Sequence, residues 1–313
     1  MASLKDIKLK ILSYKKTGTV THAMEAVSAV KMRKGQERAL SSRAYAAAAL
    51  SILERLSATV DVARHPLLKE QDPSTSLRVN KTCMVIITSD KGLAGSLNSG
   101  VIRKAEQELS RRRLDKQDVC FVAFGRRGGD YFASRGYEVL VKHENVSDGV
   151  SEEEIRDATD KLLTMHAKGG IGSALVIYQN FVSTFEQQPS VRQIVPITSA
   201  MIQQFVVGIR PAKGKYAPLG APESLTKAAT YTIEPDADTV LTELLPRLLN
   251  IAVFHALLES KASEHSARMV AMKSATDKAK EMAHNLTRTF NKVRQAAITR
   301  EVSEITSGIE AMR

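Results

Sequence analysis

The last fifth of the chain is its longest stretch without a helix-breaking residue. Residues 247–307 contain neither proline nor glycine and are rich in Ala, Leu, Met, Lys, Arg and Glu. These residue types favour an α-helix, and at 1.5 Å per residue the run extends roughly 90 Å. A helix of that length exceeds the width of a small domain. The sequence therefore predicts that most of it projects from any globular body and needs a partner for its apolar side.

Side chains suited to such a partner recur along this run at alternating spacings of four and three residues, the heptad pattern of a coiled coil. Several of them are small, which lets two helices approach closely. The predicted contact positions are Leu258, Ala262, His265, Met269, Met272, Thr276, Ala279, Ala283, Leu286, Phe290, Val293 and Ala297.

The N-terminal segment offers the partner. Residues 1–65 contain no proline and only two glycines, Gly18 and Gly35. The apolar spacing slips near Gly18, which predicts a stutter or local loosening there. Because a compact insert separates the two ends, we expect them to pair as an antiparallel coiled coil. Two independent surface helices on one large domain are the alternative, which the length of the C-terminal run disfavours. The candidate contact residues of this segment are Leu4, Ile7, Ile11, Tyr14, Met24 and Val27.

The middle of the chain has an α/β pattern. Short apolar, β-branched runs predict strands at 83–88, 119–124, 137–141 and 174–178, and a further strand, either parallel or antiparallel, at 192–196. Helical patterns cover 101–109 and 151–166, the second opening on Ser151 as N-cap. Strands that alternate with helices predict a mostly parallel sheet with helices on its faces. Residues 206–233 are rich in Gly and Pro and predict a loop-rich return.

The predicted fold class is therefore α/β plus coiled coil, with a Rossmann-like α/β domain inserted between two long helices. The predicted division has three parts. Residues 1–65 form the N-terminal coiled-coil helix, residues 66–235 the Rossmann-like domain, and residues 236–313 the C-terminal coiled-coil helix.

The charge of the chain is concentrated at its two ends. Residues 1–65 hold twelve Lys or Arg against five Asp or Glu, and residues 247–313 hold eleven against seven. The segment between them holds 22 of each and is neutral, although the whole chain carries +11. Two solvated helix faces would explain this distribution. The distribution would also be explained if both ends form one basic structure that binds an acidic partner or nucleic acid.

Composition excludes several classes of protein. Trp is absent and aromatic residues make up 5%, which argues against a base-stacking nucleic-acid platform. No apolar run approaches the roughly 20 residues that span a bilayer, and lysines interrupt the N-terminus, so neither a transmembrane segment nor a secretory signal is expected. Cys83 and Cys120 stand in unrelated contexts, which fits a reducing compartment without a disulfide framework. We expect both to be buried structural thiols.

No segment supplies a complete active site. The strand–loop–helix TSDKGLAGSLN at 88–98 has a glycine loop, but its spacing is GxxG, and the lysine of a P-loop is missing. A tight structural turn is therefore favoured over nucleotide binding. Residues 125–129, GRRGG, predict a basic, flexible, solvated turn. The histidines lack metal-ligand spacing. The sequence predicts no catalytic residues, no cofactor and no metal.

The terminal motifs resemble those of one family. Residues 21–34, THAMEAVSAVKMRK, resemble the first-helix signature of the gamma subunit of F-type (rotary) ATP synthases. Residues 88–98 resemble that family's loop after its first strand. The most distinctive blocks are ESKASEHSARMVAMKSATD at 259–277 and NKVRQAAITRE at 291–301. The resemblance covers essentially the whole chain.

This resemblance implies the same fold, with the coiled coil inside a hexamer of alternating alpha and beta subunits. Its base would stand on the ring of c subunits together with the epsilon subunit. The chain would carry no ATP chemistry and would serve as the rotor shaft that couples proton flow to ATP synthesis or hydrolysis. It would be a peripheral protein on the cytoplasmic face of a bacterial inner or plasma membrane, with an organellar inner membrane as the alternative. Thiol regulation, found in plastid members, is not expected, because the two cysteines are 37 positions apart.

The resemblance also implies which residues contact the catalytic subunits or serve coupling. Guanidinium and amide groups among them can make charge-assisted contacts with carboxylates of the surrounding subunits. The implied residues are Met24, Lys31, Arg33, Arg268, Thr276, Arg294, Gln295, Thr299 and Glu301.

Two further hypotheses come from other classes of protein. One is a Rossmann-like enzyme or nucleotide-binding protein with a coiled-coil arm, which turnover by the chain alone would favour. The other is a basic coiled coil that binds nucleic acid, which salt-sensitive binding at a defined site would favour.

Overall fold

The computed structural model describes residues 3–59, 81–196 and 236–312. It contains two compact units. The first, here called the helix-pair unit, comprises Met1–Ala29 and Arg268–Arg313. The second, the sheet unit, comprises Val30–Ala267. The predicted domain boundaries at 65/66 and 235/236 fall at or within stretches outside the described residues and stay predictions.

Two long helices contribute to both units. Helix α1 runs over Leu4–Thr59 with 56 residues, and helix α6 over Ala237–Glu310 with 74 residues. A reciprocal capping box starts α1: the backbone N–H of Asp6 donates to Ser3 Oγ at 3.2 Å, and that of Ser3 donates to Asp6 Oδ2 at 3.1 Å. Asp236 caps α6 by accepting the backbone N–H of Thr239 at 2.8 Å. The long terminal helices predicted from the sequence are confirmed.

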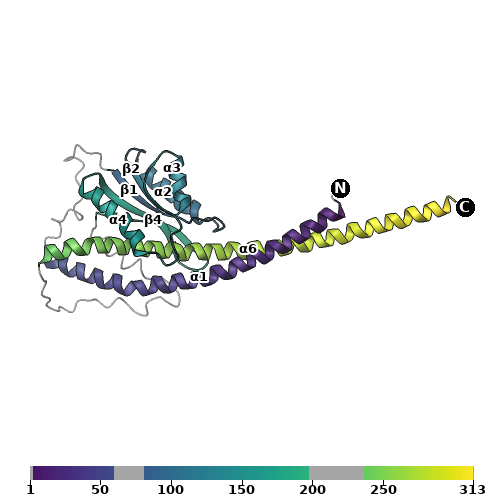
Figure 1. Ribbon diagram of the computed structural model, residues 1–313, viewed down its shortest axis with the longest axis horizontal. Helices are drawn as coiled ribbons and strands as arrows, with labels where there is room; N and C mark the ends of the chain where they lie inside the picture. The colour runs from purple at the N-terminus through teal and green to yellow at the C-terminus, as the bar shows by residue number, and fades with distance from the viewer. Residues whose placement is uncertain (1–2, 60–80, 197–235, 313) are drawn as a thin grey trace. The chain divides into compact units, whose positions relative to one another are not determined.

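Within the helix-pair unit, α1 and α6 run antiparallel (Figure 1). The Oγ1 atoms of Thr21 and Thr276 lie 2.6 Å apart, and a Cβ built on Gly18 would lie 3.7 Å from Cβ of Ala279. Residues three positions earlier in α1 therefore contact residues three positions later in α6, which confirms the predicted antiparallel pairing.

The predicted slip at Gly18 is wrong. The helix is continuous there, and Gly18 is buried against α6. The next inward positions are Thr21 and Ser28, whereas Val27, predicted as a contact residue, is 56% exposed. A search for apolar spacing misses this because glycine and serine do not register as hydrophobic, yet their small size is what allows close helix approach.

We expect Gly18→Ala to stabilise the isolated chain by about 1 kcal/mol. A Cβ at 3.7 Å is an ordinary van der Waals contact, and glycine within a helix is about 1 kcal/mol less favourable than alanine. Thermal unfolding followed by circular dichroism measures the effect. Gly18→Leu has no room beside Ala279 and should lower the melting temperature instead. Gly308→Ala, in open space near the end of α6, is the control for propensity alone. A clear loss of stability in Gly18→Ala would contradict the packing described here.

In the sheet unit, five strands form one mixed sheet in the order β3-β2-β1-β4-β5. The strands β1, β2, β3 and β4 are parallel, and β5 is antiparallel to β4. The predicted mostly parallel sheet is confirmed, and the last strand, whose direction the sequence left open, is antiparallel. The strand bounds are Lys81–Ile87 for β1, Val119–Phe124 for β2, Glu138–His143 for β3, Ile171–Phe181 for β4 and Gln187–Val195 for β5.

Helices cover both faces of this sheet. Helices α2 (Leu97–Arg112) and α3 (Arg126–Ser134) pack on the face to which β1 points Met84 and Ile86. The opposite face, with Cys83, Val85 and Ile87, packs against α4 (Glu152–Ala167) and the α6 residues between Leu245 and Leu258. Both faces of β1 are therefore buried, as its continuous apolar sequence predicted. The first turns of α6 therefore form one side of the domain core.

Helix α3 was not predicted, because residues 125–129 were interpreted as a flexible, solvated turn. The structure starts α3 at Arg126 and buries Gly128 and Gly129. A Cβ on Gly128 would lie 2.9 Å from Thr88 Oγ1, and one on Gly129 would lie 2.9 Å from Cε of Lys142. The glycines therefore serve close packing of α3 on the sheet rather than flexibility.

The predicted start of α4 is confirmed. The Oγ of Ser151 accepts the backbone N–H of Glu154 at 3.3 Å, which is the expected N-cap contact. The helix ends at Ala167, just before Gly169, whose φ of 72° lies in the left-handed region that favours glycine.

Candidate functional site

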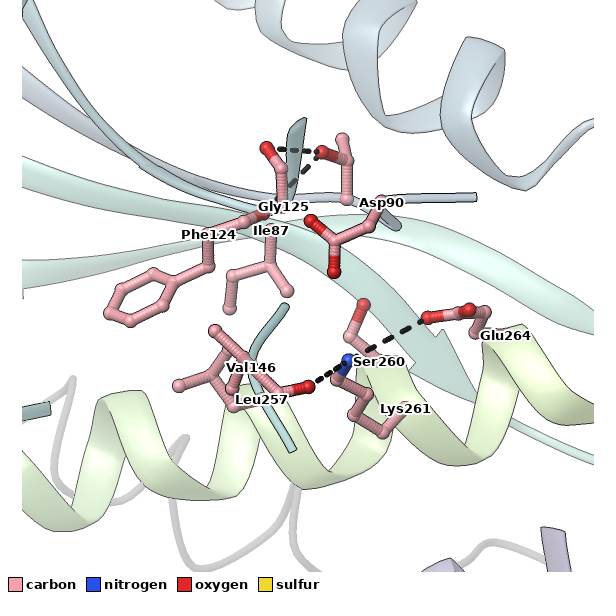
Figure 2. A pocket seen from close by; sticks show the side chains of 10 residues that line it. Ile87, Asp90, Phe124, Gly125, Val146, Leu257, Ser260, Lys261 and Glu264 are labelled. Atoms are coloured by element: carbon pink, nitrogen blue, oxygen red, sulfur yellow. Dashed lines mark hydrogen bonds and ion pairs between the residues drawn. The ribbon is translucent and has the colours of Figure 1, made fainter. Parts of the chain in front are cut away.

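The carboxyl edge of the sheet is where Rossmann-like domains hold their ligands. In this chain the edge next to Ile87 and Phe124 faces the α6 turns that carry Leu257, Ser260 and Lys261 (Figure 2). The cavity left between them has a volume of about 10 Å³, which is room for one water molecule. A nucleotide does not fit there, which argues against the hypothesis of a nucleotide-binding enzyme at this edge.

The glycine loop at 88–98 is tied by its own side chains. Asn98 Oδ1 accepts the backbone N–H of Ser89 at 2.9 Å, and Asn98 Nδ2 donates to Ser89 Oγ at 2.8 Å. The Ser89 hydroxyl donates in turn to the carbonyl of Lys91 at 2.6 Å. Gly95 supplies the left-handed backbone that the turn requires, with φ of 57°. These bonds make the loop the structural turn that the sequence favoured.

The C-terminal end of α6 is largely exposed. Extended along the pair, the observed register sets Leu4 opposite Val293, so the last turns of α6 continue past the start of α1 (Figure 1). Apolar side chains at spacings of four and three remain exposed on these turns, and no partner in the described part of the chain covers them. They are Ile298, Val302, Ile305, Ile309 and Met312, with exposed fractions between 52% and 84%.

Four of the residues implied by the family resemblance lie on the same end of α6. Arg294, Gln295, Thr299 and Glu301 are all exposed. The Thr299 hydroxyl donates to the carbonyl of Gln295 at 3.0 Å. This end of α6 thus presents a basic and an acidic group, an amide and a row of apolar side chains to the outside.

Two others of the implied residues are engaged within the chain. Thr276 is 2% exposed, and its hydroxyl contacts Thr21 of α1. The ammonium of Lys31 lies 2.8 Å from Asp148 Oδ2, with about half of the Lys31 side chain exposed. Thr276 therefore belongs to the contact between the two helices rather than to an outer surface.

The comparisons with known proteins agree with one another. A family model described as ATP synthase matches residues 3–312. The chain is 36% identical over 312 residues to the ATP synthase gamma chain of Heliobacterium modesticaldum, and 35% identical to that of Pelotomaculum thermopropionicum, with complete coverage of both chains in each case. The chain belongs to the ATP synthase gamma chain family.

Solved structures show the same fold. A chain of the Euglena gracilis mitochondrial ATP synthase, from a structure of the OSCP/F1/c-ring assembly, matches with a TM-score of 0.62 and 16% identity, covering 99% of this chain and 94% of that one. A chain from the central stalk and c-ring of the Tetrahymena thermophila mitochondrial ATP synthase matches with a TM-score of 0.57 and 22% identity, covering 82% and 99%.

The remaining residues implied by the family resemblance differ in exposure. Met24 and Arg268 are half-buried, and Arg33 is exposed. The described residues contain no helix long and apolar enough to cross a membrane. In those same ranges, no group of three His, Cys, Asp or Glu side chains is arranged to hold a metal ion.

The two cysteines of the chain lie side by side, although 37 positions separate them in the sequence. Cys83 of β1 and Cys120 of β2 are paired neighbours in the parallel sheet, and both are fully buried. The hydrogen bond with Cys120 and burial raise the pKa of the Cys83 thiol. Sequence spacing carries no information on register between strands, so this proximity was missed. Their burial agrees with the predicted structural role.

Asp148, in the loop between β3 and α4, was not predicted from the sequence. Its carboxylate accepts from Lys31 Nζ at 2.8 Å and from His265 Nε2 at 2.8 Å. Burial of the Asp148 carboxyl alone would raise its pKa, but the hydrogen bonds and charges of Lys31 and His265 outweigh burial and lower the pKa to about 2. An aspartate in a loop gives no sequence signal, because its two partners lie more than a hundred positions away.

The lowered pKa of Asp148 predicts an acid-dependent loss of stability. The folded chain favours the carboxylate form of Asp148, so the ionised side chain stabilises the fold. This stabilisation is complete above about pH 4 and disappears as the pH falls through about 2. Urea unfolding at several pH values should therefore show Asp148→Asn less stable than the wild type at pH 5, with the difference shrinking toward pH 2. A difference that stays constant with pH would contradict the assignment.

Proposed function

We propose that this chain is the central rotor of a proton-translocating ATP synthase, which couples rotation driven by proton flow to ATP synthesis and hydrolysis in a catalytic hexamer. The chain itself is non-catalytic. The observation that carries the proposal is the pairing of α1 and α6, with the C-terminal end of α6 exposed beyond the start of α1, in a chain whose relatives are named ATP synthase gamma chain. Among the matched solved structures, one is of a central stalk with its c-ring and another is of a rotor.

The geometry of the helix-pair unit suits a shaft. Thr21 packs on Thr276 and Gly18 on Ala279, so the helices approach closely and support each other along the pair. A shaft can favour one conformation of a surrounding subunit only by contacting it differently from the others. The outer surface provides such differences, because α1 and α6 carry different exposed side chains and α6 alone continues at the end.

The implied partners are the alpha and beta subunits in a 3:3 hexamer, the epsilon subunit and the ring of c subunits. We assign Met24, Arg33 and Arg268 to contacts with the catalytic subunits. We also assign the exposed group at the end of α6 to these contacts. Its row of apolar side chains can be buried by the surrounding subunits, and its polar groups can pair with polar groups of those subunits. That group is Arg294, Gln295, Thr299 and Glu301.

The place of action is a membrane surface. The chain acts as a peripheral subunit on the cytoplasmic face of a bacterial inner or plasma membrane, in keeping with its bacterial relatives. In the proposed division of labour, residues 1–65 and 236–313 form the shaft, and residues 66–235 form the domain attached to it.

Purification of the tagged chain from its native membranes tests the proposal. Alpha and beta subunits should copurify in equal amounts, and the isolated chain should neither hydrolyse ATP nor bind it tightly. Turnover by the chain alone would favour the enzyme hypothesis. Recovery of nucleic acid without the catalytic subunits would favour the hypothesis of a nucleic-acid-binding coiled coil.

We expect Met24→Lys to reduce proton pumping per ATP hydrolysed several-fold while the complex still assembles. An ammonium at this half-buried position can pair with a partner carboxylate in one rotational state, and a charge-assisted hydrogen bond is worth about 1.5–3 kcal/mol. The rotor would then leave that rotational state more slowly than the other states. Acidification of inverted vesicles, divided by the ATPase rate, measures the effect. Met24→Leu is the control, and normal pumping in Met24→Lys would remove the residue from the coupling surface.

A further inference from the structure

The loop between β3 and α4, residues 144–150, reaches both long helices within the sheet unit. The carbonyl of Val146 accepts from Lys261 Nζ at 2.9 Å, and Asp148 accepts from His265 at 2.8 Å, both donors being on α6. The second carboxylate oxygen of Asp148 accepts from Lys31 on α1. One carboxylate therefore joins three segments that are far apart in the sequence. We call this contact of Lys31, Asp148 and His265 the Asp148 bridge.

The helices are close at this level, which is why one side chain can reach both. A Cβ on Gly35, one turn from Lys31, would lie 3.5 Å from the backbone and Cβ of Ala262, one turn from His265. The next residue of the loop also faces α1: a Cβ on Gly149 would lie 3.1 Å from a guanidinium nitrogen of Arg38. The loop thus lies against the line where the two helices meet.

The two helices depend on this loop to different degrees. Helix α6 is built into the sheet core through residues between Leu245 and Leu258, and its Ser263 hydroxyl donates to the carbonyl of Gln179 in β4 at 3.1 Å. Among the α1 side chains described, residues 3–38, none belongs to the two core clusters of the sheet. Within that range, the contacts of α1 with the loop include the Asp148 bridge and the approach of Arg38 to Gly149.

Burial and charge favour a defined geometry for the bridge. His265 is 4% exposed, while Asp148 and Lys31 are partly exposed. An ionised carboxylate only accepts hydrogen bonds, so Nε2 of His265 carries the hydrogen, and each oxygen of Asp148 has its own donor. Hydrogen bonds to an ionised group are shorter and stronger than those between neutral groups.

We propose that Asp148 is a positioning residue that ties α1 to the sheet domain and so fixes the register and rotation of α1 against α6. The proposal rests on the proposed function in one respect: a load applied to the domain reaches both helices of the shaft only if α1 turns with it. Without the bridge, α6 stays anchored in the core, and α1 is held mainly by its contacts with α6.

Hydrogen exchange in the isolated, full-length chain tests the bridge independently of rotor function. Backbone amides of α1 around residues 28–38 should exchange roughly five-fold faster in Asp148→Asn and in Lys31→Met, as for loss of a partly exposed ion pair. The double variant should be no faster than either single variant, because both remove the same contact. Asp148→Glu should restore part of the protection.

A matched control is Asp130→Asn. Asp130 of α3 pairs with Lys142 of β3 at 2.6 Å, and α3 packs on the face of the sheet opposite the one that α6 covers. Its loss should leave exchange in α1 unchanged. If Asp148→Asn does not fold, Lys31→Met decides, since it removes only the α1 arm and leaves the contact of Asp148 with His265. Unchanged α1 exchange, or additive effects in the double variant, would overturn the proposal.

Membrane vesicles test the role of the bridge in the assembled complex. Asp148→Asn should lower proton pumping per ATP hydrolysed about two- to three-fold, with Asp130→Asn as control and Asp148→Glu as partial rescue. Faster exchange with unchanged pumping would mean that the bridge transmits no load, and the positioning role would be rejected while the rotor function stands. Failure of the wild-type chain to copurify with alpha and beta subunits would reject the rotor function instead.

Discussion

A proline at Ala283 is expected to abolish assembly of the complex. Ala283 lies within α6 and is 6% exposed, in the helix pair. Proline removes one backbone hydrogen bond and clashes with the preceding turn, which destabilises a helix interior by about 3 kcal/mol or more. Here the resulting kink would also separate α6 from α1. Copurification of alpha and beta subunits with the tagged variant measures the loss.

Deletion of residues 302–313 is the comparison for this variant. These residues lie past the start of α1 in the observed register, so their removal breaks no contact between the two helices. It removes part of the exposed apolar row and should weaken assembly less than Ala283→Pro does. Equal loss in the two variants would argue that the end of α6, rather than the pair, holds the complex together, and would count against the shaft.

Gly125→Ala is expected to destabilise the sheet domain by about 3 kcal/mol. Gly125 has a φ of 91°, and a Cβ there would lie 2.1 Å from the carbonyl oxygen of Thr88, far inside contact distance. Because that oxygen belongs to the backbone at the end of β1, relief requires the strand or the start of α3 to move. Urea unfolding of the isolated chain measures the change.

Gly95→Ala separates strain from steric overlap. Gly95 also has a positive φ, 57°, but a Cβ added there would meet no atom of the described residues within 4 Å. Alanine there should lower stability by only about 1 kcal/mol, the usual penalty of a left-handed residue. Similar losses at the two glycines would show that backbone conformation, and not the approach of Thr88, dominates at Gly125.

The parts of the fold that were predictable are those with a strong local signal. The uninterrupted run at 247–307 indicated α6, and the apolar run at 83–88 indicated β1. Ser151 indicated the start of α4, because its capping contact is made within three residues. In each case the physical cause lies in the segment itself, so no knowledge of the surroundings was needed.

The parts that were missed depend on distant partners. Helix α3 has two glycines in its first turn that lower helix propensity but fit against Thr88 and Lys142. The slip predicted near Gly18 was wrong because the reason for a small residue there is its contact with Ala279 on the other helix. Asp148 had no signal at all before Lys31 and His265 were placed beside it. The predicted residues at the end of α6 came from family resemblance, and their partner contacts stay predictions.

The two roles of α6 limit how the protein could be shortened. Its residues from Leu245 to Leu258 close one side of the sheet, whereas Thr276 and Ala279 face α1. A minimal axle made by excising the globular insert and splicing the two helices together would leave that leucine-rich surface bare to water. Such a truncated protein would precipitate or self-associate unless those leucines were replaced by hydrophilic residues.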